Sequence, residues 1–125
     1  MITLLCMTFM LTACKSKSFE SKRHFEYHFF KEEYEEKYNQ VEKTLELEQD
    51  ANYKINITST LDSGTIIMKL SYLNNDGKEI VFNMVAPNSD VVEIACGTTS
   101  TVTFTVQIND DTQGNVKVEI LSDNK

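Results

Sequence analysis

The chain has 125 residues and a formal net charge of −7. A chain of this length suits one domain around one hydrophobic core, which argues against a second domain. General nucleic-acid binding needs clustered Lys and Arg, and the acidic balance argues against it. The acidity is uneven, because residues 15–23 are mostly basic and residues 31–50 are rich in Glu.

The N-terminus is apolar. Residues 2–11 contain only two polar residues, both Thr, and Thr12 and Ala13 then stand directly before Cys14. A run of this length is too short to span a bilayer, which needs roughly 20 residues. It matches the apolar region of a secretory signal peptide.

The segment Leu11-Thr12-Ala13-Cys14 resembles the lipobox of bacterial lipoprotein precursors, in which small residues precede a Cys that receives a diacylglyceryl group. The resemblance implies a signal peptide at residues 1–13, cleavage between Ala13 and Cys14, and lipid attachment at Cys14. Two acyl chains, such as palmitate, give stable anchoring, whereas one chain binds a membrane only reversibly.

One feature departs from the lipoprotein pattern. Residues 1–14 contain no Lys or Arg, although the family has a basic segment ahead of the apolar run. We interpret this as a start codon further upstream. The alternative is a soluble protein in which residues 1–11 form an apolar strand of the fold.

The lipobox also predicts the state of the cysteines. Cys6 leaves with the signal peptide and Cys14 becomes a thioether, so Cys96 alone keeps a free thiol and no internal disulfide is expected. A nucleophilic Cys96 would need a nearby base. We interpret Cys96, which precedes Gly97, as a small buried apolar residue.

Residues 14–23 are polar and basic, and we predict a tether there, followed by a single domain at residues 24–125. Aromatic residues alternate along residues 25–29, as in a half-buried strand. From Phe30 onward they recur at helical spacing in a stretch rich in Glu and Lys. We predict a strand at residues 25–29 followed by a short helix or charged loop, and a continuous helix is the alternative.

Only the helical alternative would place His24 and His28 on one helix face as a pair of metal ligands. No motif marks a third ligand, so we interpret both histidines as solvated.

From about residue 43 the pattern is strand after strand. The predicted strands lie at residues 44–48, 53–57, 65–73, 80–84, 92–96, 102–108 and 116–120. Asn74-Asn75-Asp76-Gly77 predicts a hairpin, because these residues tolerate positive φ. We expect residues 102–108 to pair with residues 116–120. The fold class is therefore mainly β, an antiparallel β-sandwich of about seven strands that is immunoglobulin-like.

Residues 63–70 and 75–80, an apolar strand followed by an Asp-Gly-Lys turn, resemble the strand-hairpin unit of small Gram-positive lipoproteins with immunoglobulin-like sandwiches. This resemblance extends from about residue 41 to the end of the chain. It implies a fold and an extracytoplasmic location, not an activity.

The search for chemistry finds no Gly-rich phosphate loop, no Gly-x-Ser-x-Gly elbow and no Cys pair at zinc spacing. Two pairs could supply oxygen ligands to calcium, and they are Asp110 with Asp111 and Asn74 with Asp76. A third pair, Glu32 with Glu33, could supply the two carboxylates of glycoside hydrolysis. We interpret these pairs as ordinary loop or solvated residues. We expect no catalytic residue, no metal and no cofactor.

These observations predict a non-catalytic binding module, anchored to the extracytoplasmic face of the cell membrane through Cys14. Its partner would be a protein or a cell-wall ligand, met by edge strands or loops. An accessory or structural subunit of an envelope complex, including an inhibitor or immunity role, is the alternative. A small hydrolase is the third hypothesis, and it would need perturbed carboxylates or Cys96 beside a histidine.

Overall fold

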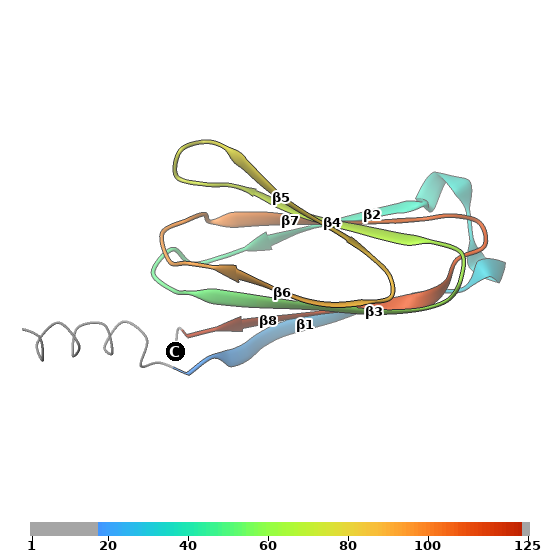
Figure 1. Ribbon diagram of the computed structural model, residues 1–125, viewed down its shortest axis with the longest axis horizontal. Helices are drawn as coiled ribbons and strands as arrows, with labels where there is room; N and C mark the ends of the chain where they lie inside the picture. The colour runs from blue at the N-terminus through green and yellow to red at the C-terminus, as the bar shows by residue number, and fades with distance from the viewer. Residues whose placement is uncertain (1–17, 124–125) are drawn as a thin grey trace, which may run out of the picture.

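The structure, a computed structural model, describes residues 18–123. Two four-stranded antiparallel sheets pack face to face (Figure 1). The strands are β1 (Glu20–Phe29), β2 (Gln40–Glu46), β3 (Tyr53–Ser63), β4 (Ile66–Leu73), β5 (Glu79–Val85), β6 (Asn88–Ile94), β7 (Thr101–Ile108) and β8 (Gln113–Ser122). The prediction of a mainly β antiparallel sandwich is confirmed.

The strand order is β1-β8-β3-β6 in one sheet, called sheet A here, and β2-β7-β4-β5 in the other, called sheet B. This is the order of a jelly roll. An immunoglobulin sandwich instead keeps its last two strands in one sheet. The predicted pairing of residues 102–108 with residues 116–120 is therefore wrong, because β7 pairs with β2 and β4 while β8 pairs with β1 and β3.

The loop between β7 and β8 explains why these strands do not form a hairpin. The buried hydroxyl of Thr112 donates to the carbonyl oxygen of Thr65 at 2.7 Å and accepts from the backbone N–H of Asn109 at 2.9 Å. Gly64, with φ +74°, lies so close that a Cβ there would be 2.5 Å from the Thr112 nitrogen. This packing turns the chain from sheet B into sheet A.

The core lies between the sheets and comes from alternate positions of the strands, as a pleated strand requires. The largest fully buried side chains are those of Leu45, Ile55, Ile57, Ile66, Met68, Leu70, Val102, Phe104, Val106, Val116, Val118 and Ile120. The positions between them face outward and carry mostly polar residues.

The N-terminal strand is longer than predicted. β1 contains the predicted strand at residues 25–29, and two 3₁₀ turns, Lys31–Glu33 and Glu36–Tyr38, follow it. The alternative of a continuous helix is wrong. β1 also includes residues 20–23, expected as tether, because β8 offers them partners as far as Ser122. None of the helical turns among residues 18–123 has the length and apolarity needed to cross a membrane.

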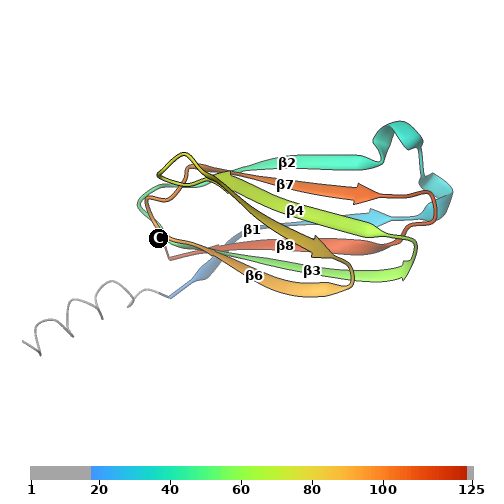
Figure 2. The same ribbon diagram turned by 45° about the horizontal axis from the view of Figure 1, so that its top comes forward.

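The predicted hairpin at residues 74–77 is confirmed, with β4 and β5 as its strands. The Asn74 side-chain oxygen accepts from the backbone N–H groups of Asp76, at 2.9 Å, and Lys78, at 3.0 Å. Gly77 has φ +78°. Figure 1 shows this hairpin rising from the sandwich at the end where β1 begins and β8 finishes, and Figure 2 agrees.

Candidate functional site

The residues predicted for cleavage and lipid attachment, Ala13 and Cys14, lie outside the described residues 18–123. The described chain approaches β1 across the outer face of sheet A. There the Lys54 ammonium lies 4.4 Å from the centre of the Phe19 ring. A cation over an aromatic ring is weakly attractive, so this contact directs the start of β1.

Cys96 is exposed, so the prediction of a buried residue is wrong. The inward alternation of β6 ends at Ile94. Past this point the backbone N–H of Cys96 donates to the Asn52 side-chain oxygen at 2.8 Å, and Gly97 turns the chain with φ +79°. Because β1 and β6 are opposite edges of sheet A, the fold separates Cys96 from the histidines of β1.

His24 and His28 lie on the outer face of β1. Four residues along a strand span about 13 Å, too far for both to bind one metal ion. His28 instead lies 3.0 Å from a carboxylate oxygen of Glu26. No group of three or more His, Cys, Asp or Glu residues within 18–123 could hold a metal ion.

The acidic pairs have local surroundings. Asn74 binds the backbone of its own turn, and Asp110, Asp111, Glu32 and Glu33 are exposed in loops or 3₁₀ turns. The sandwich does not bring the three pairs together with the histidines into one cleft.

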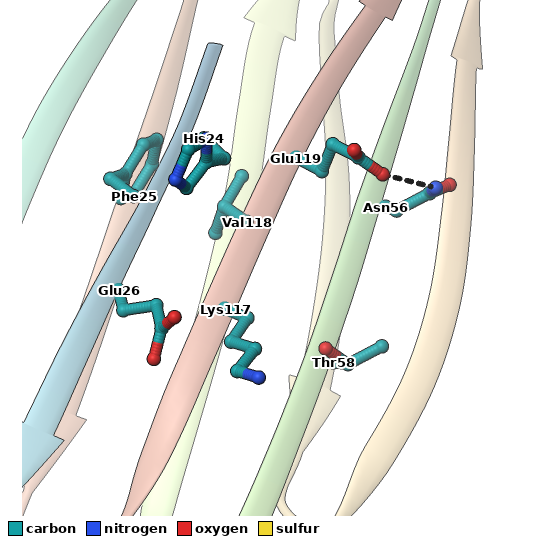
Figure 3. A pocket seen from close by; sticks show the side chains of 8 residues that line it. All are labelled: His24, Phe25, Glu26, Asn56, Thr58, Lys117, Val118 and Glu119. Carbon is teal, nitrogen blue, oxygen red and sulfur yellow. Dashed lines mark hydrogen bonds between the residues drawn. The ribbon is translucent and has the colours of Figure 1, made fainter. Parts of the chain in front are cut away.

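The outer face of sheet A has a shallow hollow of about 320 Å³ (Figure 3). Two rows of side chains cross it, and they are His24, Glu119 and Asn56, then Glu26, Lys117 and Thr58. The Asn56 amide donates to Glu119 at 3.4 Å, and Glu26 faces Lys117 across the strands. The hollow is open and is crossed by charged and polar side chains, whereas small ligands prefer enclosed sites.

The sandwich has two open sides, where the edges of its sheets meet. At the β1/β2 side the ring of Phe25 is half-buried. The Arg23 guanidinium donates to the Glu46 carbonyl oxygen at 3.0 Å and so connects the two sheets. The Lys43 ammonium lies 5.0 Å from the centre of the Phe25 ring. Tyr27 also lies on this side of the sandwich, and its burial raises the pKa of the phenol above 10.0. Long cationic side chains thus cover the β1/β2 side.

The β5/β6 side is different, because large apolar side chains are exposed there. We define the β5 edge as the five residues Ile67, Leu73, Val81, Phe82 and Val85, which are between 37% and 60% exposed. Val81 and Val85 point to the outer face of sheet B, and Phe82 points to the opposite face, where its ring stacks on Tyr72 at 6.4 Å. β5 therefore presents apolar groups on both of its faces.

The backbone of β5 is also available. Hydrogen bonds from Asn74 N–H to the Lys78 carbonyl, 2.9 Å, and from Ala86 N–H to the Ile66 carbonyl, 3.0 Å, fix the pattern of the β4–β5 ladder. Bonded and non-bonded pairs alternate in antiparallel strands. The N–H and C=O groups of Val81 and Asn83 are therefore directed away from β4. Such a row is a template for an added strand.

The other three edge strands carry charges within their length. β1 contains Lys22, Arg23 and Glu26, β2 contains Glu42 and Lys43, and β6 contains Asp90 and Glu93. In β5 the only charged residue is Glu79, at its first position. Charged residues on an edge discourage strand addition, so β5 is the least protected of the four edges.

Comparison with known proteins adds no relative. A scan against models of protein families finds no match, and a search of curated proteins finds none either.

No motif in the sequence marks the β5 edge. The available signal was the run from Ile80 to Val85, in which both alternate faces carry large apolar residues and no residue is charged. A strand with one buried face should alternate, so apolar residues on both faces indicate either a central strand or an exposed binding edge.

Proposed function

We propose that this chain is a surface lipoprotein, anchored to the membrane through Cys14, that acts as a non-catalytic binding module and receives a protein partner at the β5 edge. The observation that carries the proposal is an edge strand that is open on one side, has no charged residue after Glu79 and exposes apolar side chains on both faces. Strand addition uses main-chain hydrogen bonds for affinity and alternate side chains for specificity. It needs no sequence motif in the binding module.

The start of the described chain supports this proposal. Three residues lie between Cys14 and Ser18, where the described chain begins, and the four Cα–Cα steps reach at most about 14 Å. A lipid on Cys14 would thus keep the sandwich close to the membrane, and the β4–β5 hairpin lies at the same end as the start of β1 (Figures 1 and 2). The partner would then be another component of the cell surface.

The anchor is tested by the mass of the N-terminal peptide from the membrane fraction, in wild type and in Cys14→Ala. We expect a diacylglyceryl adduct on Cys14, and a variant that is shed or left uncut. An unmodified, soluble chain that begins at Met1 would contradict the anchor.

The binding surface is tested by a photo-reactive amino acid at Asn83, on the edge of sheet B, and at Ser89, on the edge of sheet A. We expect a discrete protein adduct from position 83 and none from position 89, because Asn83 lies in the unprotected strand. Val81→Lys should abolish the adduct. Equal labelling at both positions would contradict the assignment. An obligate subunit of an envelope complex would also leave the membrane with its partner at fixed stoichiometry, whereas a free module would not.

A further inference from the structure

We infer that the strand received at the β5 edge is β5 of a second copy of this chain. The inference rests on the proposed use of the β5 edge and names its partner. An antiparallel strand pair has a two-fold axis perpendicular to the sheet, so a self-complementary edge can pair with itself.

The register with the longest overlap has Phe82 at the two-fold axis. Val81 of one copy then faces Asn83 of the other, and Glu79 faces Val85. These are the residues whose N–H and C=O groups point away from β4, so each pair exchanges its backbone hydrogen bonds. The whole of β5 is paired in this register.

The side chains match as well as the backbone. The two-fold axis keeps outer face with outer face, so the Val81 side chains of the two copies become diagonal neighbours, and each Val85 lies between Ile67 of its own copy and Glu79 of the other. On the other face, the two Phe82 rings meet at the axis, each next to its stacked Tyr72. No charged residue faces a like charge, since Glu79 lies opposite a valine. The two copies thus cover each other's exposed apolar surface.

The edges β2 and β6 are less suitable. Self-pairing of β2 about its centre would place Lys43 opposite Lys43, and like charges directly across a strand pair are destabilising. Self-pairing of β6 about Val91 would place Asp90 opposite Val92 and Glu93 opposite Ser89, so four carboxylates would enter the pair without a cation opposite them. In β5 only Glu79, at the end of the strand, is charged.

A shared membrane favours this partner. Each chain carries a net charge of −7, which opposes association in solution. Anchors in one membrane raise the effective concentration of each copy for the other. In the pair, the two copies of sheet B would form one continuous sheet, and the two copies of sheet A would lie on the same side of it.

The test is a disulfide at the axis, in the full chain in its native membrane. The background is Cys96→Ser, which removes the exposed thiol. In Phe82→Cys, the two new thiols would lie on residues directly opposite in a non-hydrogen-bonded pair, with Cβ atoms about 4.5–5.5 Å apart, near disulfide range. We expect mild oxidation to yield a covalent dimer that the Cys96→Ser parent does not form.

Asn83→Cys is the matched control. In this register the two Asn83 residues are diagonal neighbours, about 7–8 Å apart, so we expect at least tenfold less dimer from it. Equal yields from Phe82→Cys and Asn83→Cys would overturn the register and the inference with it.

Charge at the edge gives a second readout. Val81→Lys added to Phe82→Cys should lower the dimer yield at least tenfold, while Ser89→Lys, on the edge of sheet A, should leave it unchanged. Thermal unfolding checks that both variants are folded. A folded Phe82→Cys chain that stays monomeric, while its Cys14 peptide carries the lipid, would overturn the second copy and leave the anchored module standing.

Discussion

The two open sides of the sandwich are treated in opposite ways. On the β1/β2 side, Arg23 connects the sheets through the Glu46 carbonyl and Lys43 covers the ring of Phe25. On the β5/β6 side, Phe82 and Val85 remain exposed, and β5 diverges with its hairpin from the body of the sandwich (Figure 1). Both sides present edge strands with unpaired backbone groups. Cationic side chains cover the β1/β2 side, and no such cover protects β5.

The difference separates stability from interaction. Aromatic rings on the β1/β2 side pack against the core, so their burial contributes to the free energy of unfolding. Apolar groups of the β5 edge contribute little until a partner covers them. The β1/β2 side therefore contributes mainly to stability, whereas the β5 edge is suited to association.

The largest expected effect compares one phenylalanine from each side. Phe25→Ala should lower the free energy of unfolding by about 2–3 kcal/mol, because the ring contacts Tyr27 and Phe104 at 5.6 and 6.3 Å. Phe82→Ala should cost less, about 1–1.5 kcal/mol, since this residue is 37% exposed. Urea unfolding of both variants measures the two losses in free energy of unfolding. Equal losses would mean that the two sides contribute equally to stability.

The second prediction concerns a lysine placed on the β5 edge, where it should act like the charged residues of the other edge strands. Val81→Lys places a cation beside the two-fold axis of β5, at a side chain that is 39% exposed, where the lysines of the two copies would be diagonal neighbours and repel each other. We expect at least a tenfold loss of association between copies, or about 1.4 kcal/mol, with the free energy of unfolding unchanged to within about 0.5 kcal/mol. Sedimentation of the full chain, extracted in detergent, measures the association, and undiminished association would argue against the edge.

A smaller effect is expected when the connection between the sheets is removed. Arg23→Ala loses the hydrogen bond to the Glu46 carbonyl and should cost about 0.5–1 kcal/mol. Its neighbour Lys22 provides the control, because its 3.8 Å ion pair with Glu20 is solvent-exposed and is worth close to zero. Urea unfolding should distinguish the two alanine variants, and an equal result would mean that Arg23 does not hold the sheets together.

The smallest effect concerns pH. Burial raises the pKa of Tyr27 above its usual 10.0, so the folded chain keeps this phenol neutral at a pH where the unfolded chain ionises it. Stability from Tyr27 is therefore fully present below pH 10 and is lost as pH rises through the folded-state pKa. Tyr27→Phe should flatten this alkaline loss slightly. Unfolding of wild type and variant at a series of alkaline pH values measures the difference, and identical pH profiles would contradict it.

Local features of this fold could be predicted from sequence. The strands at residues 25–29 and 65–73, and the turn at residues 74–77, follow from alternation and turn chemistry, which neighbours along the chain determine. The strand order could not be predicted in this way. Val102 and Val116 alternate into the same core from opposite sheets, and an alternating pattern shows that a strand has an inward face without showing which sheet holds it.

The same limit applies to the site. Cys96 continues the apolar alternation of β6, yet a hydrogen bond from its backbone to Asn52, 44 residues earlier, turns the chain outward before that position. The β5 edge likewise depends on which strand lies at the border of a sheet, a property of topology. The sequence shows that residues 80–85 carry no charge, but only the sheet order shows that this strand lies at an edge.

The pairing of the first strand with the last has a kinetic consequence. Phe25 of β1 lies beside Val118 of β8, so β1 has no ladder to join until residues 113–122 have been synthesised. Contacts between distant parts of a chain form slowly, because the long intervening loop must close first. Among the eight strands, the N-terminal strand β1 is thus the first to be made and the last to be fixed. Its aromatic face stays accessible throughout that interval.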